Sequence, residues 1–302
     1  MSALVWLRSD LRSNWHSPLD YAIAHHQKVR AVYCLTPEQW QQYLYAPCKI
    51  NLIIERLKVV KTELAARNVI LTLINTGDFQ QTPEAIVSFC QQQQINTVYF
   101  NAEYEWDERV RDKQLKKLCE LQNINVAKFH DTCIVKPELV LSKQATPYKM
   151  FTPYFKSWLA ELYRSFPQVS ANTKASESLV ELGELELSQF KKTTEIKDYE
   201  VSSEAIYRQL RDFITQYAPD YGDARDVPAL DGTSHISHLL SIGALAPKQC
   251  VFMLQQEYGE TLLEPTHGVY IWLKELAWRD FYRYVAFHFT HVNKHLPFQK
   301  HY

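Results

Sequence analysis

The chain of 302 residues lacks the glycine-rich loops that cradle phosphates in many nucleotide-binding enzymes. It has seven glycines, and none of them belongs to a P-loop, to a Gly-x-Gly-x-x-Gly pattern after the first strand or to a Gly-x-Ser-x-Gly elbow. Those patterns serve nucleotide hydrolysis, nicotinamide chemistry and esterase chemistry. The sequence therefore argues against all three classes of reaction.

Long apolar runs are also missing, because nowhere do 18 apolar residues follow one another. The N-terminus shows no basic stretch followed by an apolar stretch and a small-residue cleavage site. We therefore expect a cytoplasmic protein with no membrane segment. The six cysteines form no Cys-x-x-Cys pair, which disfavours a zinc site and favours buried free thiols; they are Cys34, Cys48, Cys90, Cys119, Cys133 and Cys250.

An excess of positive charge is the third absence. The formal net charge is -1, and residues 201–302 hold nine Lys or Arg against eleven Asp or Glu. A nucleic-acid-binding domain usually carries a clear basic excess. Any contact with DNA must therefore come from the placement of a few side chains.

The first 137 residues alternate short β-branched or aromatic runs with amphipathic stretches. Strands are predicted at residues 4–7, 29–35, 69–74, 97–100 and 126–129, and the clearest helix at residues 50–66. Such alternation predicts an α/β domain with a doubly wound, Rossmann-like parallel sheet. Ligands of such sheets bind beyond the carboxyl ends of the strands.

The remainder of the chain changes character twice. Residues 138–201 are expected to form an interdomain connection, because Ser, Thr, Lys and Glu replace the periodic pattern from about residue 165. Residues 202–302 are expected to form a partial all-α domain. Its predicted helices cover residues 203–217, 234–241, 247–258 and 270–289.

Residues 272–283 are the most informative segment. On a helix, Trp272, Glu275, Trp278, Arg279 and Tyr282 follow each other at three or four residues and form one stripe. A stripe that mixes tryptophans with an acid and a base is unusual for a core face or a solvated face. The alternative is structural, with the tryptophans packed inward and an ordinary surface ion pair beside them.

Two further segments carry polar groups suited to a ligand. Gly232 precedes Thr233 and Ser234 at a predicted helix start, where backbone N–H groups and hydroxyls suit a phosphate. Residues 104–112 are acidic and follow the fourth predicted strand, where carboxylates could bind a polar heterocycle. In isolation, helix capping is the favoured interpretation of both segments.

Taken in order, these segments resemble the DNA photolyase and cryptochrome family, and most closely its bacterial folate-type members that repair cyclobutane pyrimidine dimers. Residues 5–12 resemble the family's opening strand, and residues 148–154 its "YxxFTP" element. Residues 225–237 resemble the start of the flavin pocket, and residues 272–282 the "WLxELxWRxFY" helix. Members continue for well over a hundred further residues, so we expect a flavin-binding domain that is C-terminally truncated.

The resemblance implies specific roles. It implies a site for flavin adenine dinucleotide (FAD) at Tyr221, Thr233, Ser234, His235, Ile236, Ser237, Trp272, Glu275 and Arg279. It implies that DNA containing pyrimidine dimers is contacted by Arg225, Glu275, Trp278, Arg279 and Tyr282, of which Glu275 and Trp278 are the catalytic residues. A methenyltetrahydrofolate antenna would be bound by Asp107, Glu108 and Lys294.

The expected function is thus light-dependent repair of dimers by an electron from reduced FAD, in a monomeric lyase. Two alternatives remain open at this point. One is a cryptochrome-like blue-light photoreceptor, and the other is an antenna module that binds folate without flavin.

Overall fold

The computed structural model describes residues 2–169, 173–177, 187, 199–294 and 296–298. Five parallel strands form one sheet in the order β3-β2-β1-β4-β5. Their bounds are β1 Ser2–Leu7, β2 Lys28–Leu35, β3 Ile70–Asn75, β4 Thr97–Asn101 and β5 Asn125–Phe129. This is the order of a doubly wound sheet, so the predicted fold class is confirmed for this part of the chain.

Successive side chains of β1 point to opposite faces of the sheet, and both sets are apolar. Both faces are therefore covered by helices. Val5 joins the cluster that includes the buried sides of α1 (Ser17–His25) and α3 (Pro47–Ala65). Trp6 joins the cluster that includes α4 (Thr82–Gln92) and α5 (Trp106–Leu121). A short helix, α2 (Pro37–Gln42), follows β2.

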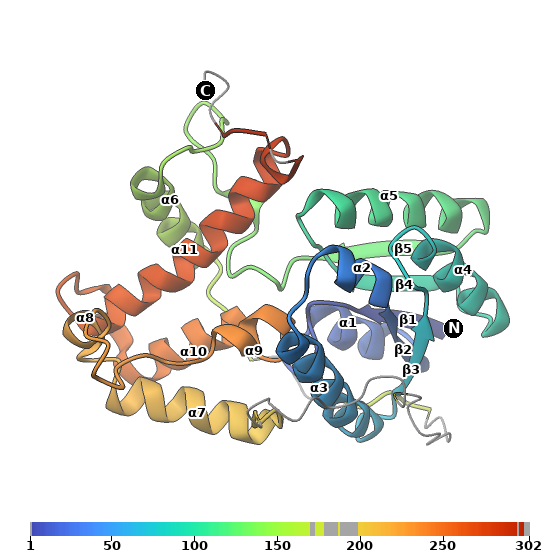
Figure 1. Ribbon diagram of the computed structural model, residues 1–302, viewed down its shortest axis with the longest axis horizontal. Coiled ribbons are helices and arrows are strands. Elements are labelled where there is room, and N and C mark those ends of the chain that lie inside the picture. The colour runs from blue at the N-terminus through green and yellow to red at the C-terminus, as the bar shows by residue number, and fades with distance from the viewer. Residues whose placement is uncertain (1, 170–172, 178–186, 188–198, 295, 299–302) are drawn as a thin grey trace.

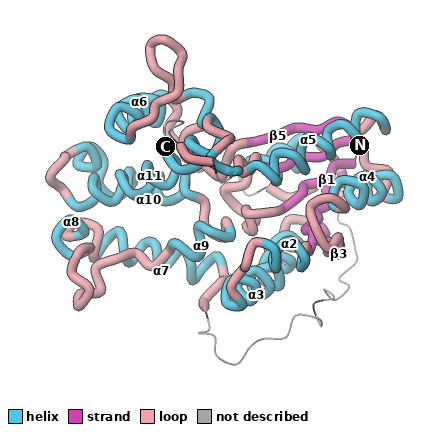
Figure 2. Tube along the Cα trace, turned by 45° about the horizontal axis from the view of Figure 1, so that its top comes forward, coloured by secondary structure: helices cyan, strands magenta, loops and turns pink. Residues whose placement is uncertain are grey.

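The second part of the described chain is helical and stands beside the sheet (Figures 1 and 2). Its longest helix, α11, packs against α6, α8 and α10. The bounds are α6 Phe151–Arg164, α7 Ser203–Gln216, α8 Tyr221–Ala224, α9 Ser237–Ile242, α10 Pro247–Tyr258 and α11 Gly268–His288, with 3-10 turns η1 Pro137–Leu139, η2 Gly259–Leu263 and η3 Val292–Lys294.

Two expectations need correction. The helix predicted from residue 234 begins at Ser237, because His235 has a left-handed φ of 50° that interrupts a right-handed helix. Cys48 is exposed, whereas the other five thiols are buried as expected. Cys48 lies in the first turn of α3, outside the row of residues with which that helix contacts the sheet.

The sheet and the helical part are joined through the loop after β1. The Leu11 N–H donates to the Ile242 carbonyl at 3.1 Å, and Arg12 donates to the Gly243 carbonyl at 3.1 Å. Gly243 has a φ of 68°, and a Cβ there would lie 2.1 Å from the Ser9 carbonyl oxygen. This close backbone approach requires glycine.

Asp280 of α11 forms a second joint. Its Oδ2 accepts hydrogen bonds from the Ile134 N–H, the Val135 N–H and the Trp158 indole at 2.8, 3.1 and 3.0 Å. One carboxylate thus connects α11, α6 and the loop after β5. None of the helices among the described residues is long and apolar enough to span a membrane.

Candidate functional site

An open hollow of about 500 Å³ lies along α11. Its lining consists of Glu105, Glu275, Trp278, Arg279, Tyr282, Arg283 and Ala286. Glu275, Trp278, Arg279 and Tyr282 in this lining belong to the stripe predicted from the sequence, and Arg283 and Ala286 extend it by one turn. Trp272 is the exception, because it is 3% exposed and packs in the core at 4.9 Å from the Phe213 ring centroid.

An aromatic stack forms one wall of the hollow. The Trp278 ring lies 3.6 Å from the Phe151 ring, centroid to centroid, with an angle of 7° between the planes. Tyr282 follows one turn later at 5.8 Å from Trp278 and is 67% exposed. Phe151 of α6 covers one face of the Trp278 ring, and the Tyr282 end of the stack is exposed to solvent.

The carboxylate of Glu275 lies one turn before Trp278. Its Oε1 accepts a hydrogen bond from Arg225 Nη1 at 2.6 Å. Hydrogen bonding to Glu275 raises the pKa of Arg225. The hollow therefore has a carboxylate and a flat apolar surface one turn apart on α11, and Arg225 from the end of α8 is bonded to that carboxylate.

Arg279 serves a different contact. Its two terminal nitrogens donate to the carbonyl oxygens of Thr132 at 2.8 Å and Leu240 at 3.4 Å. Burial, with a smaller contribution from Arg283, lowers the pKa of Arg279 to about 10. Arg279 thus fixes α11 to the sheet domain and to α9.

The segment before α9 carries exposed polar side chains. His235 Nε2 lies 2.6 Å from Asp231 Oδ1 and 3.3 Å from the Thr233 hydroxyl. Ser237, the first residue of α9, is exposed, and Ser234 is half-buried. Ile236 is buried and packs in the core, so its side chain is not free for a ligand.

A second cavity, of about 330 Å³, lies beyond the carboxyl ends of the strands. Arg8 and Ser9 follow β1, Thr36 follows β2 and Glu103 follows β4. Aromatic side chains form much of the remaining wall, namely Trp6, Tyr33, Trp40, Tyr43, Tyr45 and Phe79. The sequence predicted a ligand at this edge of the sheet but, of these residues, named none in a binding role; polar residues directly after strands were the available signal.

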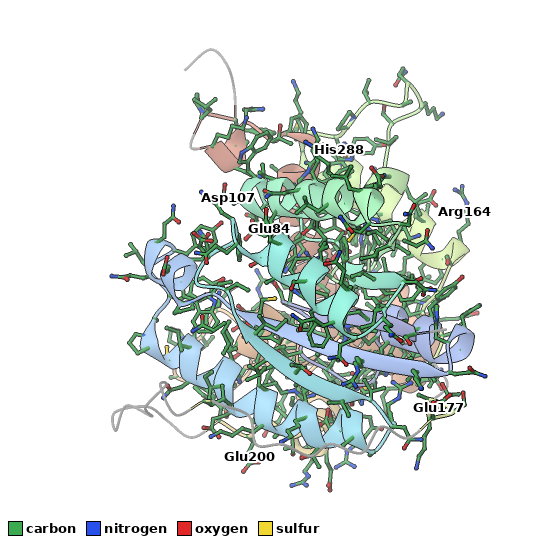
Figure 3. All side chains as sticks on the ribbon, turned by 90° about the vertical axis from the view of Figure 1, so that its right-hand side faces the viewer. Glu84, Asp107, Arg164, Glu177, Glu200 and His288 are labelled. Carbon is green, nitrogen blue, oxygen red and sulfur yellow. The ribbon has the colours of Figure 1, made fainter. Side chains whose placement is uncertain are left out.

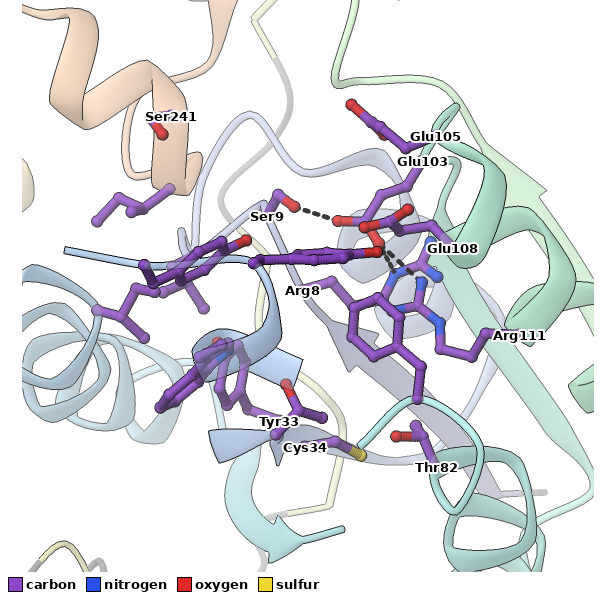
Figure 4. A pocket seen from close by; sticks show the side chains of 18 of the residues that line it. Arg8, Ser9, Tyr33, Cys34, Thr82, Glu103, Glu105, Glu108, Arg111 and Ser241 are labelled. Carbon is purple, nitrogen blue, oxygen red and sulfur yellow. Dashed lines mark hydrogen bonds and ion pairs between the residues drawn. The ribbon is translucent and has the colours of Figure 1, made fainter. Parts of the chain in front are cut away.

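Glu103 and Glu108, both labelled in Figure 4, have pKa values that are shifted in opposite directions. Burial favours the neutral form of Glu103, but Arg8 and Arg111 outweigh it and lower its pKa to about 2. Burial and then the charges of Glu103 and Glu105 raise the pKa of Glu108 to about 8. Glu108 is 8% exposed, and its Oε2 has no hydrogen-bond partner. The surroundings of Glu108 therefore favour its neutral, protonated form.

The model of one protein family, described as DNA photolyase, matches residues 3–172. The chain belongs to the DNA photolyase family. Curated photolyases agree along nearly the whole chain: the "Deoxyribodipyrimidine photo-lyase" of Vibrio cholerae is 36% identical over 94% of it, and that of Escherichia coli 32% over 98%. The chain covers 61% and 62% of those two proteins, so it spans about three fifths of their length.

A solved photolyase structure shares the fold. The bacterial class III photolyase of Agrobacterium tumefaciens superposes with a TM-score of 0.77, over 96% of this chain and 59% of the other, at 21% identity. The photolyase fold thus extends across the sheet and the helical part.

The three residues predicted from the sequence to bind an antenna lie around the start of α5, but in different surroundings. Glu108 lines the cavity of the sheet domain. Asp107 lies on the outside of the molecule (Figure 3), where Tyr43 donates to its Oδ2 at 2.9 Å. Lys294 Nζ lies 3.4 Å from the Trp106 ring centroid. The structure therefore brings Lys294 of η3 to α5, across almost 190 residues of sequence.

Proposed function

We propose that the chain acts in the light-dependent repair of cyclobutane pyrimidine dimers, as a deoxyribodipyrimidine photo-lyase. The observation that carries this proposal is that Glu275 and the Trp278 ring, which stacks on Phe151, line the same open hollow. Membership of the DNA photolyase family supports it.

The hollow suits a base that has left the duplex. Extrusion of a base costs a few kcal/mol, less for a damaged pair, and stacking on an aromatic ring returns about 1–3 kcal/mol. Trp278 would stack on the dimer, and Glu275 would accept a hydrogen bond from it. Arg225 and the exposed Tyr282 would contact the neighbouring DNA.

The residues before α9 fit the phosphate end of FAD. Thr233, Ser234 and Ser237 offer hydroxyl donors, and none of the three is fully buried. Tyr221, half-buried against Phe213, and His235 would lie beside them. Trp272 and Arg279 would support this site from the core rather than contact the nucleotide. When bound, the flavin supplies the electron that splits the dimer.

The cavity of the sheet domain is proposed as the antenna site. Its aromatic wall suits a planar chromophore, and the unpartnered Glu108 Oε2 suits the amide edge of such a ring. Methenyltetrahydrofolate is the first candidate, with its ring at Glu108 and its remainder extending toward Asp107 and Lys294. A flavin-type chromophore is the competing outcome.

The test is an absorption and fluorescence spectrum of the purified chain before and after FAD is added, followed by binding to DNA with and without a dimer. We expect a bound flavin band and a preference for the dimer that Trp278→Ala abolishes and the control Trp106→Ala does not. Flavin without a preference for dimers would indicate a photoreceptor. A folate spectrum without flavin would indicate an antenna module.

A further inference from the structure

Arg225 occupies the place where a lesion would meet Glu275. Its Nη1 donates to Glu275 Oε1 at 2.6 Å, while its Nε lies 3.5 Å from Asp226 Oδ1. The side chains of Arg225 and Glu275 are 32% and 39% exposed. The pair is therefore an open contact at the rim of the hollow rather than a part of the core.

Close packing determines where this pair lies. A Cβ on Gly222 of α8 would lie 2.6 Å from the Ile271 Cδ1 atom of α11. A Cβ on Gly232 would lie 2.3 Å from the Ala224 Cβ atom, directly before Arg225. Gly222 allows α8 and α11 to approach each other, and Gly232 allows the following loop to pack against the end of α8. Together these contacts hold the backbone of Arg225 within reach of Glu275.

The arginines of this region differ in how free they are to move. Arg279 is bound by the carbonyl oxygens of Thr132 and Leu240 and has lost most of its contact with water. Arg225 projects from the C-terminal end of α8, and its two acidic partners are themselves partly or largely exposed. Arg225 can therefore change partner without opening the core.

We propose that Arg225 is an exchangeable partner of Glu275, which it holds in the free protein and leaves for a DNA phosphate when DNA binds, so that Glu275 is released for the lesion. The inference rests on the proposed function, because it requires DNA at the hollow. Arg225 is then a positioning residue: its contact with a phosphate leaves the Glu275 carboxylate free to accept a hydrogen bond from the lesion.

The energetics favour such an exchange. An ion pair that is one third exposed contributes little to stability, so it costs little to break. A guanidinium matches a phosphate in two parallel hydrogen bonds, and each phosphate that is neutralised also releases counterions. Before the exchange, Arg225 cancels the negative charge of Glu275 and thus reduces its repulsion of the approaching DNA.

The test uses undamaged duplex DNA, in which no base is flipped and Glu275 has no lesion to bind. Affinity is measured against salt concentration for the full chain and for Arg225→Gln, Glu275→Gln and the double variant. Glu257→Gln, which removes an exposed carboxylate from α10, controls for net charge. Circular dichroism and the thermal midpoint show whether each variant folds.

Exchange predicts that Glu275→Gln binds undamaged DNA about two- to five-fold more tightly at low salt, because Arg225 no longer has to leave a partner. The gain exceeds that of Glu257→Gln, and in the Arg225→Gln background it falls to the net-charge effect that Glu257→Gln shows. Arg225→Gln lowers the salt slope by about 0.9, one phosphate contact, and Arg225→Lys restores it.

A gain from Glu275→Gln that is undiminished without Arg225 would overturn the exchange, and so would an unchanged salt slope in Arg225→Gln. These measurements require neither flavin nor light. Loss of dimer repair would contradict the proposed function and leave the exchange standing. Failure of the exchange would leave repair possible with a fixed Arg225–Glu275 pair.

Discussion

Trp278 and Phe151 stack face to face at 3.6 Å, although 126 residues separate them in the sequence. Phe151 opens α6, and Trp278 lies in the middle of α11. The stack therefore fixes the orientation of the ring on which we propose that the lesion stacks. Two motifs that the sequence shows separately form one platform.

Replacement of Phe151 by Leu should weaken binding of dimer-containing DNA by up to about tenfold, because an aromatic pair contributes about 0.5–1.5 kcal/mol beyond its buried area. Binding of undamaged DNA should change little. Phe151→Tyr keeps the ring and serves as the matched control. Equal losses on damaged and undamaged DNA would show that Phe151 acts on general folding instead.

Asp280 should be a main determinant of stability. Asp280→Ala leaves two backbone N–H groups and the Trp158 indole without an acceptor, and we expect the free energy of unfolding to fall by about 3–5 kcal/mol. Asp280→Asn keeps one acceptor oxygen and should cost clearly less. Urea denaturation measures both variants, and similar costs would argue against the three hydrogen bonds as the cause.

Glu108 predicts a defined dependence of stability on pH. Its pKa is about 8 in the folded chain and 4.5 when unperturbed, so between these values the folded chain keeps a proton that the unfolded chain has lost. The free energy of unfolding should therefore decrease as pH rises from about 4.5 to about 8. Glu108→Gln should remove this slope and be more stable than the parent chain at pH 8.5. Parallel pH profiles for the two proteins would refute the assignment.

The two positive-φ glycines Gly243 and Gly259 allow a direct comparison of strain and contact. Ala at Gly259 meets nothing within 4 Å and adds only the backbone strain of a φ of 53° with a ψ of -123°, about 1–3 kcal/mol. Ala at Gly243 also meets the Ser9 carbonyl at 2.1 Å, so the loop after β1 must move. We expect a loss of roughly 3 kcal/mol or more there. Equal thermal midpoints for the two variants would show that the joint between the two parts adapts freely.

The sequence predicted the strands well because each is a short run that contains β-branched or aromatic residues. The helix from Pro247 to Tyr258 was also predicted with its bounds, because Pro247 occupies its first turn and Gly259 its end. The predicted start of α9 was wrong because a hydrophobic pattern does not reveal the left-handed backbone of His235. The stripe on α11 was predicted apart from Trp272, whose burial depends on Phe213 of α7.

Contacts between distant segments could not be predicted. The Arg225–Glu275 pair depends on two glycine contacts between α8, α11 and the following loop. The raised pKa of Glu108 depends on its burial and on the charge of Glu103, which lies in the loop after β4. Periodicity describes one helix or strand at a time, so it contains no information about these neighbours.

The most direct test of the central claim is repair of a single thymine dimer in an oligonucleotide by the FAD-loaded chain under blue light. Repair is measured as the recovery of the ultraviolet absorbance of the two thymines. The account predicts light-dependent repair that falls in Glu275→Gln and Trp278→Ala, while Glu257→Gln remains active. An FAD-loaded chain that binds the dimer but leaves it intact under illumination would contradict the account.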